Sequence, residues 1–275
     1  MPLKLMYITN NPLIASVAEK AGVDWIFVDL EYIGKEKRQK GLDTVKSHHT
    51  IKDVINIRSE IHESELLVRI NPIHENSVNE INDVIVAGAD IIMLPYFKSV
   101  EEVRFFLKTI NGRCQTCLLL ETPEAVGILD EIINLEGIDY IHIGLNDLHL
   151  GYKLNFMFEL LVNGVVENIC TKLSDTGIKY GFGGIAKIGE GSLPSNYIIP
   201  EHYRLKSEMV ILSRTFYNSA VITSLDEVES VFNEGISKIR QFEKTVSVYT
   251  RNDFKENKIK IRTLVSNIVN EIGDL

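Results

Sequence analysis

Two carboxylates directly follow apolar stretches of the chain. Glu121 ends "CLLLE" and Asp147 follows "IHIGLN". A carboxylate beside buried residues is costly unless a cation or hydrogen-bond donors neutralise it. Magnesium and manganese prefer such oxygen ligands, and magnesium usually takes only one or two protein carboxylates. Without a cluster of His or Cys nearby, the pair indicates a hard-cation site. The alternatives are an anion at a helix N-terminus for Glu121 and a helix N-cap for Asp147.

Three further charged residues stand at the ends of apolar stretches. Asp29 and Glu31 end "WIFVDLE", and Arg69 lies near the end of "ELLVRIN". These types could supply fixed charge to a polar substrate, provided that the fold brings their stretches together. The arrangement of these apolar stretches must therefore be inferred from the rest of the sequence.

Apolar runs of strand length alternate with segments of helical periodicity along most of the chain. Such runs are typical of buried parallel strands, and the segments between them of crossover helices. The predicted strands are 3–9, 25–31, 65–71, 91–96, 116–121, 140–146, 179–185 and 209–215. Eight such units predict a (β/α)8 barrel spanning residues 1–245, and a doubly wound open sheet is the alternative.

One junction recurs between helices and strands. It reads "AGVDWIF" at 21–27, "AGADIIM" at 87–93 and "EGIDYIH" at 136–142. Glycine suits a helix C-terminus, and an aspartate precedes each following strand. Helix starts are marked by Ser99 with Glu102 and by Thr122 followed by proline.

A barrel would gather the charged residues at one end. Active sites of such barrels lie at the carboxyl ends of the strands, here called the barrel mouth. Because side chains alternate along a strand, Arg69 shares a face with Leu67, and Glu121 shares one with Leu119. We therefore expect Arg69 and Glu121 to point into the barrel mouth, with Asp147 nearby.

Composition excludes several classes of function. The chain has 275 residues, is 45% hydrophobic and carries a net charge of −9, so it can build one large core but is poorly suited to bind nucleic acid or anionic membranes. No apolar run approaches the roughly 20 residues of a membrane helix, and the N-terminus does not resemble a signal peptide. Three cysteines indicate a reducing compartment, so we expect a cytoplasmic protein.

Residues 246–275 exceed what eight units need. Their apolar residues recur at helical spacing, namely Ile261, Leu264, Val265, Ile268, Val269 and Ile272. This C-terminal helical extension could pack on its own barrel, or it could contact another subunit in a homo-oligomer.

Five stretches resemble the HpcH/HpaI aldolase and citrate lyase family. They are "VDWIFVDLE", "LLVRINP", "AGADIIMLPYFKSVEEV", "LLLETPEAVGILDEI" and "IDYIHIGLNDLHLG". They occur in the family's order and cover roughly residues 20–155, whereas the C-terminal third matches only in its strand pattern. The pair "LLxET" and "IGxNDL" is the most specific part, and the arginine of "VRIN" strengthens it.

The resemblance implies a class II aldolase or lyase on a TIM barrel, dependent on Mg²⁺ or Mn²⁺. Glu121 and Asp147 then become metal ligands, and Arg69 contacts the carbonyl oxygen of a pyruvate-like 2-oxo acid. The metal would act as a Lewis acid toward the enolate. Members of the family often exchange their last helix between subunits. The loop that matches the receptor of the substrate carboxylate is Gly144, Leu145 and Asn146.

The chain departs from the family at one position. Family aldolases usually have D-x-E-H, where the histidine takes part in proton transfer, but this chain has Tyr32 there. Tyrosine is a poor base at neutral pH. His48 or His49 of "SHHT" could replace it, unless both only precede the next helix. The basic run 35–40 is expected to be solvated, or else to form a lid over an anionic substrate. Arg214 could bind an acid or a phosphate.

Three functions remain after these observations. The first is a metal-dependent carbon–carbon lyase acting on a 2-oxo acid or a related carboxylic acid. The second is an acyl-CoA lyase of the citrate lyase branch. The third is a barrel that has lost catalysis and binds a small acid. Tyr32 favours the third, and the retention of Arg69, Glu121 and Asp147 opposes it.

Overall fold

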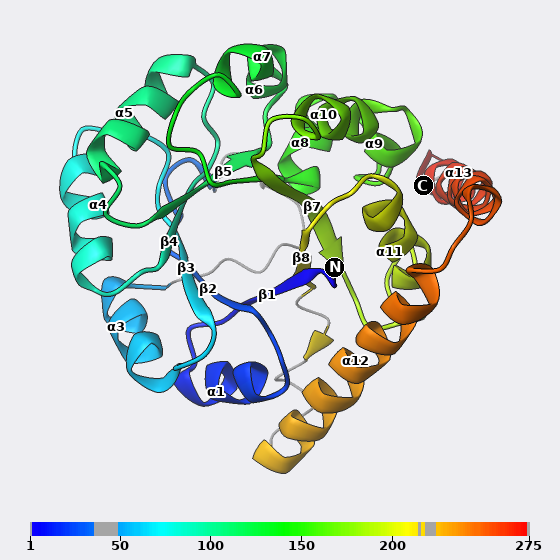
Figure 1. Ribbon diagram of the computed structural model, residues 1–275, viewed down its shortest axis with the longest axis horizontal. Coiled ribbons are helices and arrows are strands. Elements are labelled where there is room, and N and C mark those ends of the chain that lie inside the picture. The colour runs from blue at the N-terminus through cyan, green and yellow to red at the C-terminus, as the bar shows by residue number, and fades with distance from the viewer. Residues whose placement is uncertain (1, 36–48, 214–215, 218–223, 274–275) are drawn as a thin grey trace.

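The computed structural model describes residues 2–35, 49–213, 216–217 and 224–273. Its strands form a closed parallel barrel in chain order, and β1 pairs with both β2 and β8 (Figure 1). This confirms the predicted barrel and excludes the open sheet. The strands are β1 Lys4–Ile8, β2 Trp25–Asp29, β3 Glu65–Arg69, β4 Ile91–Leu94, β5 Gln115–Leu120, β6 Tyr140–Ile143, β7 Lys179–Ile185 and β8 Met209–Leu212.

Helices surround the barrel (Figure 1). They are α1 Pro12–Lys20, α3 Ile51–Glu60, α4 Ser77–Val86, α5 Val100–Ile110, α6 Pro123–Gly127, α7 Leu129–Ile132, α8 Leu145–Gly151, α9 Glu159–Val162, α10 Val165–Leu173, α11 Ser195–Arg204, α12 Leu225–Val246 and α13 Arg251–Gly273. Several strands end earlier than predicted. The largest difference follows β6, where Gly144 becomes the N-cap of α8 and residues 145 and 146 are helical.

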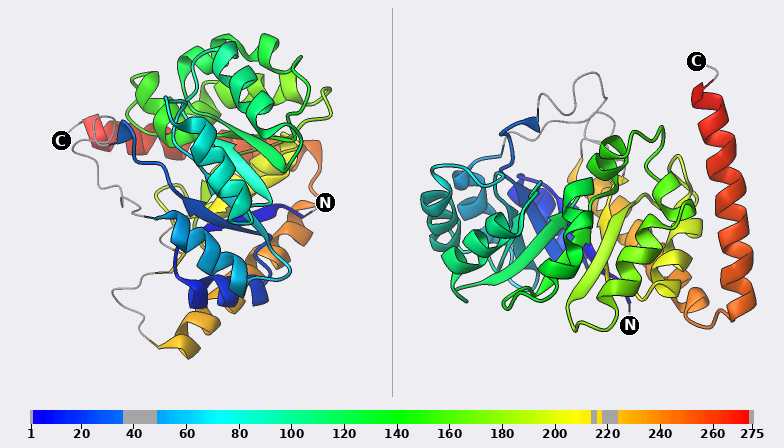
Figure 2. Two further views of the ribbon diagram at one scale, coloured as in Figure 1. Left: turned by 90° about the vertical axis from the view of Figure 1, so that its left-hand side faces the viewer. Right: turned by 90° about the horizontal axis from the view of Figure 1, so that it is seen from above.

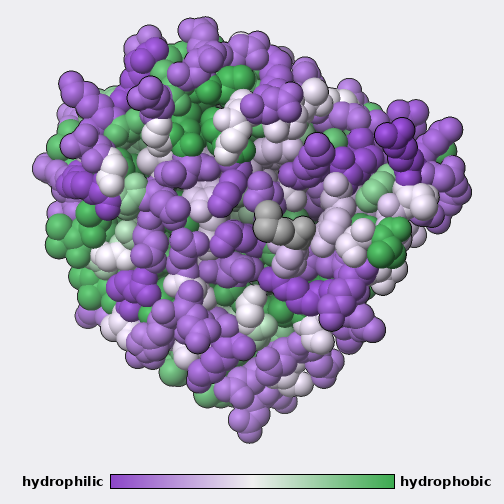
Figure 3. All heavy atoms as spheres, in the orientation of Figure 1, coloured by the Kyte–Doolittle hydropathy of each residue, from purple (hydrophilic) through white to green (hydrophobic). Residues whose placement is uncertain are grey.

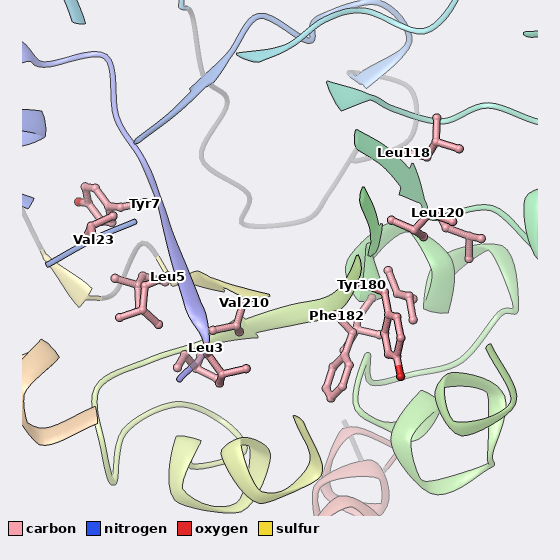
Figure 4. Packing of buried hydrophobic residues seen from close by; sticks show 14 of the residues in the cluster. Leu3, Leu5, Tyr7, Val23, Leu118, Leu120, Tyr180, Phe182 and Val210 are labelled. Carbon is pink, nitrogen blue, oxygen red and sulfur yellow. The ribbon is translucent and has the colours of Figure 1, made fainter. Parts of the chain in front are cut away.

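Side chains of the strands divide into two apolar layers. The inner layer fills the barrel and includes Trp25, Phe27, Leu67 and Leu119. The outer layer lies between strands and helices, and Figure 4 shows part of it from β1, β5, β7 and β8. Because inner and outer positions alternate, Asp29 and Arg69 continue the inner rows that contain Phe27 and Leu67. The packing of the core therefore directs these charges inward at the barrel mouth.

The recurring glycine–aspartate junction fixes the opposite end of the barrel. Its glycines have φ angles of 96°, 96° and 91°. These positive angles belong to the left-handed backbone conformation in which many helices end. Each aspartate accepts a hydrogen bond from a backbone N–H of the preceding strand, over 2.7–2.8 Å. The donors are Leu5, Leu66 and Thr116, and the acceptors are Asp24, Asp90 and Asp139. Through these hydrogen bonds, the recurring aspartates connect the starts of β2, β4 and β6 to the preceding strands β1, β3 and β5.

The C-terminal extension forms α13, which lies on the outside of the barrel beside α11 (Figure 2). Its residues Ile261 and Val265 are buried against the same chain. Lys258 Nζ forms an ion pair with Glu167 at 2.6 Å. Intramolecular packing therefore accounts for these apolar residues, while Ile272 stays 40% exposed.

Hydrophilic residues cover most of the face seen in Figure 1 (Figure 3). Within the described residues, no helix is long and apolar enough to cross a membrane.

Candidate active site

Asp29 and Arg69 form the centre of a charged cluster at the barrel mouth. They stand opposite each other at the ends of the paired strands β2 and β3. Arg69 Nε donates to Asp29 Oδ1 and Arg69 Nη2 donates to Asp29 Oδ2, each over 2.8 Å. Asp29 is fully buried. This two-point fork fixes the plane of the guanidinium group, which a single contact would not do.

Lys35 and Glu31 complete this cluster. Lys35 Nζ donates to Asp29 Oδ2 over 2.8 Å. Glu31 Oε2 lies 3.4 Å from Arg69 Nη1 and 3.6 Å from Lys35 Nζ. Lys35 is only 6% exposed, so the expectation of a solvated basic run is wrong for this residue, because two buried carboxylates attract its ammonium group. The remainder of that run, 36–40, lies outside the described residues.

Asp29 and Arg69 both stay charged, although burial disfavours the charged form of each. Burial raises the pKa of Asp29, but the charges and hydrogen bonds of Arg69 and Lys35 outweigh it and hold that pKa well below its ordinary value. Burial lowers the pKa of Arg69, but Asp29, Glu31 and Glu121 together raise it well above its ordinary value. Asp29 is therefore an anion that orients Arg69, not a base that accepts a proton at neutral pH.

Glu121 directly follows β5 and is buried. Its Oε1 accepts a hydrogen bond from the backbone N–H of Tyr96 over 3.1 Å. A Cβ atom at position 144 would lie 2.9 Å from Glu121 Oε2 and 2.8 Å from its Cβ, so the backbone there can approach the carboxylate only as glycine. Thr122, not Glu121, caps α6, through a bond from the Ala125 N–H.

Asp147 lies in the first turn of α8 and lines the same pocket as Glu121. The pocket has a volume of about 390 Å³ and also includes Tyr96, Lys98 and Glu124. The alternative of Asp147 as an N-cap is wrong, because Gly144 holds that position. Two carboxylates in one pocket suit a magnesium or manganese ion that takes its remaining ligands from water and substrate. No group of three or more His, Cys, Asp or Glu able to hold a metal occurs among the residues described.

The predicted carboxylate-binding loop is only partly available. The Gly144 N–H already donates to the Leu120 carbonyl over 3.0 Å, and its contact with a substrate stays a prediction. Gly144 instead makes room for Glu121. Leu145 and Asn146 are the first two residues of α8, where backbone N–H groups have no acceptor within their own helix. Their role toward a substrate stays a prediction.

The residues predicted to take part in proton transfer lie in different surroundings. Tyr32 is 68% exposed, and its role in proton transfer stays a prediction. His49 does reach the end of β2, where its Nδ1 accepts a hydrogen bond from the Asp29 backbone N–H over 3.0 Å. His48 and Arg214 lie outside the described residues.

Asn71 was not predicted from the sequence. Its Oδ1 accepts hydrogen bonds from the backbone N–H groups of Tyr32 and Ile33, each over 2.9 Å. Its Nδ2 donates to Glu80 Oε1 over 2.7 Å. Asn71 thus links the turn that carries Lys35 to the segment after β3. The only signal was its place directly behind the strand that ends at Arg69, in "VRIN".

Comparisons with known proteins identify similar chains. The family model for HpcH/HpaI aldolase/citrate lyase matches residues 4–156. A 2-keto-3-deoxy-L-rhamnonate aldolase of Shigella dysenteriae is 24% identical over 210 residues, which are 65% of this chain and 73% of that protein.

Two solved structures share the fold. An HpcH/HpaI aldolase from Desulfitobacterium hafniense has a TM-score of 0.59 and 14% identity, covering 91% of this chain and 95% of its own. An HpcH/HpaI aldolase/citrate lyase family protein from Burkholderia cenocepacia has a TM-score of 0.60 and 15% identity, covering 90% of this chain and 95% of its own. At these identities the likeness establishes the fold alone.

Proposed function

The chain belongs to the HpcH/HpaI aldolase/citrate lyase family and is a carbon–carbon lyase, and we propose that it is a divalent-metal-dependent aldolase that cleaves a 2-oxo acid. The observation that carries the proposal is that Glu121 and Asp147 line one pocket. Arg69, whose pKa is raised in part by the charge of Glu121, supports it with a partly buried cation at the same end of the barrel.

Glu121 and Asp147 would hold the metal, Mg²⁺ or Mn²⁺. When bound there, the metal supplies a Lewis acid for the oxygens of the substrate. The hydrogen bond from Tyr96 and the space left by Gly144 already fix the Glu121 carboxylate.

Arg69 would act on the oxygen at which negative charge develops. When a 4-hydroxy-2-oxo acid is cleaved, the bond between C3 and C4 breaks and the 4-hydroxyl group loses its proton. The electron pair passes to C3 and is delocalised onto the C2 oxygen, until C3 accepts a proton. A donor held in advance near that oxygen is worth several kcal/mol in a dry site, because it needs no reorganisation during the reaction. Asp29 supplies this preorganisation by holding the guanidinium at two points.

A pyruvate-release assay tests the proposal. Purified protein is incubated with a panel of 4-hydroxy-2-oxo acids that includes 2-keto-3-deoxy sugar acids, and pyruvate is measured by a coupled dehydrogenase. We expect release with Mg²⁺ or Mn²⁺ and none after chelation. Cleavage of an acyl-CoA thioester in place of a 2-oxo acid would favour the citrate lyase branch. Binding of oxalate without any turnover would favour a small-acid-binding barrel.

We predict that His49 is not the general base. With Nδ1 accepting the Asp29 N–H, a neutral His49 ring carries its proton on Nε2 and can accept no second proton there. A histidine base is protonated and inactive at low pH, so removing it would abolish the acid limb of the pH–rate profile. We expect His49→Gln to leave that limb in place.

Two matched variants complete this measurement. His48→Gln tests the other histidine, which remains a candidate base. Tyr32→Phe serves as a control, because its exposed hydroxyl predicts an unchanged kcat. Loss of the acid limb in His49→Gln would restore His49 as the base and would require its ring to turn away from Asp29.

We also infer that the protein is a homo-oligomer. The last turns of α13 carry Ile272, which is 40% exposed, although Ile261 and Val265 are covered by their own chain. Light scattering at micromolar concentration is expected to give a mass above that of one chain, and Ile272→Asp should lower it. A monomeric wild-type protein would contradict this inference.

A further inference from the structure

We propose that Lys35 is a positioning residue: its ammonium group shares Asp29 with Arg69 and so keeps the barrel mouth receptive to an anionic substrate. The inference rests on the proposed function for the nature of that ligand. Lys35 stands three residues after Tyr32, in a part of the chain where the family resemblance provides no role for a lysine.

The burial of Lys35 is the first argument. Lysine is almost never fully buried unless it is paired, because its ammonium group is strongly hydrated. Lys35 is 6% exposed and lies against a fully buried aspartate. An ordinary surface lysine would remain in water at lower cost, so a specific contact must hold it here.

The balance of charge is the second argument. Among the described residues, Asp29 and Glu31 each contact both Arg69 and Lys35. Without Lys35, this group of side chains would carry one more net negative charge than it does in the wild type. Such a charge repels an incoming 2-oxo acid and draws Arg69 away from its place on Asp29.

The geometry of the contacts is the third argument. Asp29 Oδ2 accepts from both Lys35 Nζ and Arg69 Nη2, each over 2.8 Å. Glu31 Oε2 lies between the same two cations, at 3.6 Å and 3.4 Å. Lys35 and Arg69 each contact both Asp29 and Glu31. Replacing Lys35 therefore changes the charge beside both carboxylates that contact Arg69.

The local backbone holds Lys35 in this position. Glu31 and Lys35 are four residues apart, and the Lys35 N–H donates to the Tyr32 carbonyl over 3.3 Å, so the chain turns back on itself. Asn71 fixes the start of the turn through the N–H groups of Tyr32 and Ile33. The turn is thereby tied to the segment behind Arg69, and its lysine faces the same aspartate.

A charge-balance cycle tests the proposal. The variants are Lys35→Met, Lys35→Arg and the double variant Lys35→Met/Glu31→Gln. The control is Lys172→Met, because Lys172 makes an ion pair of the same 2.8 Å length with Asp130 but is more exposed. Calorimetry measures the affinity for oxalate with Mg²⁺ present, and a crystal structure of each variant locates the Arg69 side chain.

We expect Lys35→Met to weaken oxalate binding by about tenfold, the low end of what an added unbalanced charge does at 4–6 Å. Lys35→Arg should recover most of the affinity, and the double variant should come within about threefold of the wild type, because removing one carboxylate restores the net charge of the wild type. A lysine that only stabilised the fold would not give this recovery of affinity. Lys172→Met should bind oxalate as the wild type does.

Two results would overturn the proposal. One is a folded Lys35→Met variant with wild-type oxalate affinity and with Arg69 still bound at two points to Asp29. The other is a folded double variant that remains tenfold weaker than the wild type, and this result decides the matter even where Lys35→Met does not fold. If the wild-type protein itself binds no oxalate, the proposed function fails. The orientation of Arg69 in the variant crystals then decides alone whether Lys35 positions it.

Discussion

Replacing Arg69 by lysine is expected to lower kcat for 2-oxo acid cleavage by roughly 10²–10³-fold, the effect of losing one preorganised donor to a developing oxyanion. Lysine keeps the positive charge but loses the planar fork that meets Asp29 at two points. The charge would remain in the barrel mouth while its direction toward the substrate oxygen is lost.

The kinetic pattern distinguishes this role from simple substrate binding. A donor that acts mainly on the developing charge lowers kcat more than it raises KM. The matched control is Arg104→Lys, because Arg104 is exposed on α5 and should tolerate the change. An Arg69→Lys variant with near wild-type kcat on the true substrate would reject the role.

The fold was predictable because its signals are local and repeated. Continuous apolar strands, helical segments and the three glycine–aspartate junctions mark the boundaries between elements, and together they predict a parallel arrangement of eight units. The sequence favoured a closed barrel but left the open sheet as an alternative, which the structure excludes. The ends of the strands were less predictable. Gly144 resembles a strand residue because its neighbours are apolar, yet the chain turns into α8 there. Glu121 occupies the space that a side chain at position 144 would need.

The candidate site also contains residues whose positions the sequence could predict and residues whose positions it could not. Arg69 and Glu121 stand at the ends of apolar stretches, so strand periodicity predicted both at the barrel mouth, with Asp147 nearby. Lys35 lies in a basic run that composition assigns to solvent, and only the approach of Asp29 and Glu31 shows its position. These two partners are close in sequence, but the turn that brings Lys35 to them is fixed by Asn71, which lies beyond β3.

Two buried histidines also show what the sequence could not predict. His149 is 8% exposed within α8, with Nδ1 3.2 Å from the Leu145 carbonyl. His142 lies inside β6, where burial lowers its pKa to about 4 and its Nε2 lies 3.1 Å from the Gly183 carbonyl. The sequence could not identify the partner of His142, because that partner belongs to another strand.

Replacing Glu121 by glutamine or Asp147 by asparagine is expected to lower metal affinity more than the roughly 10–100-fold that loss of an outer-shell partner causes. Each change keeps the size of the side chain but removes the charge that a hard cation requires. Because both carboxylates would bind one ion, the double variant should lose little beyond the weaker single variant. This lack of additivity separates a shared ion from two independent anions.

Metal-dependent stabilisation measures this effect without turnover. An ion that binds only the folded protein stabilises it by about 2.7 kcal/mol when its concentration is 100 times Kd. We therefore expect Mn²⁺ to raise the Tm of the wild-type protein and to leave that of Glu121→Gln and Asp147→Asn nearly unchanged. The matched control is Glu124→Gln, because Glu124 lines the same pocket but pairs with Lys98 at 2.8 Å, and its variant should keep the shift. Wild-type shifts in both the Glu121 and Asp147 variants would show that these carboxylates hold no ion, and the aldolase proposal would lose the observation that carries it.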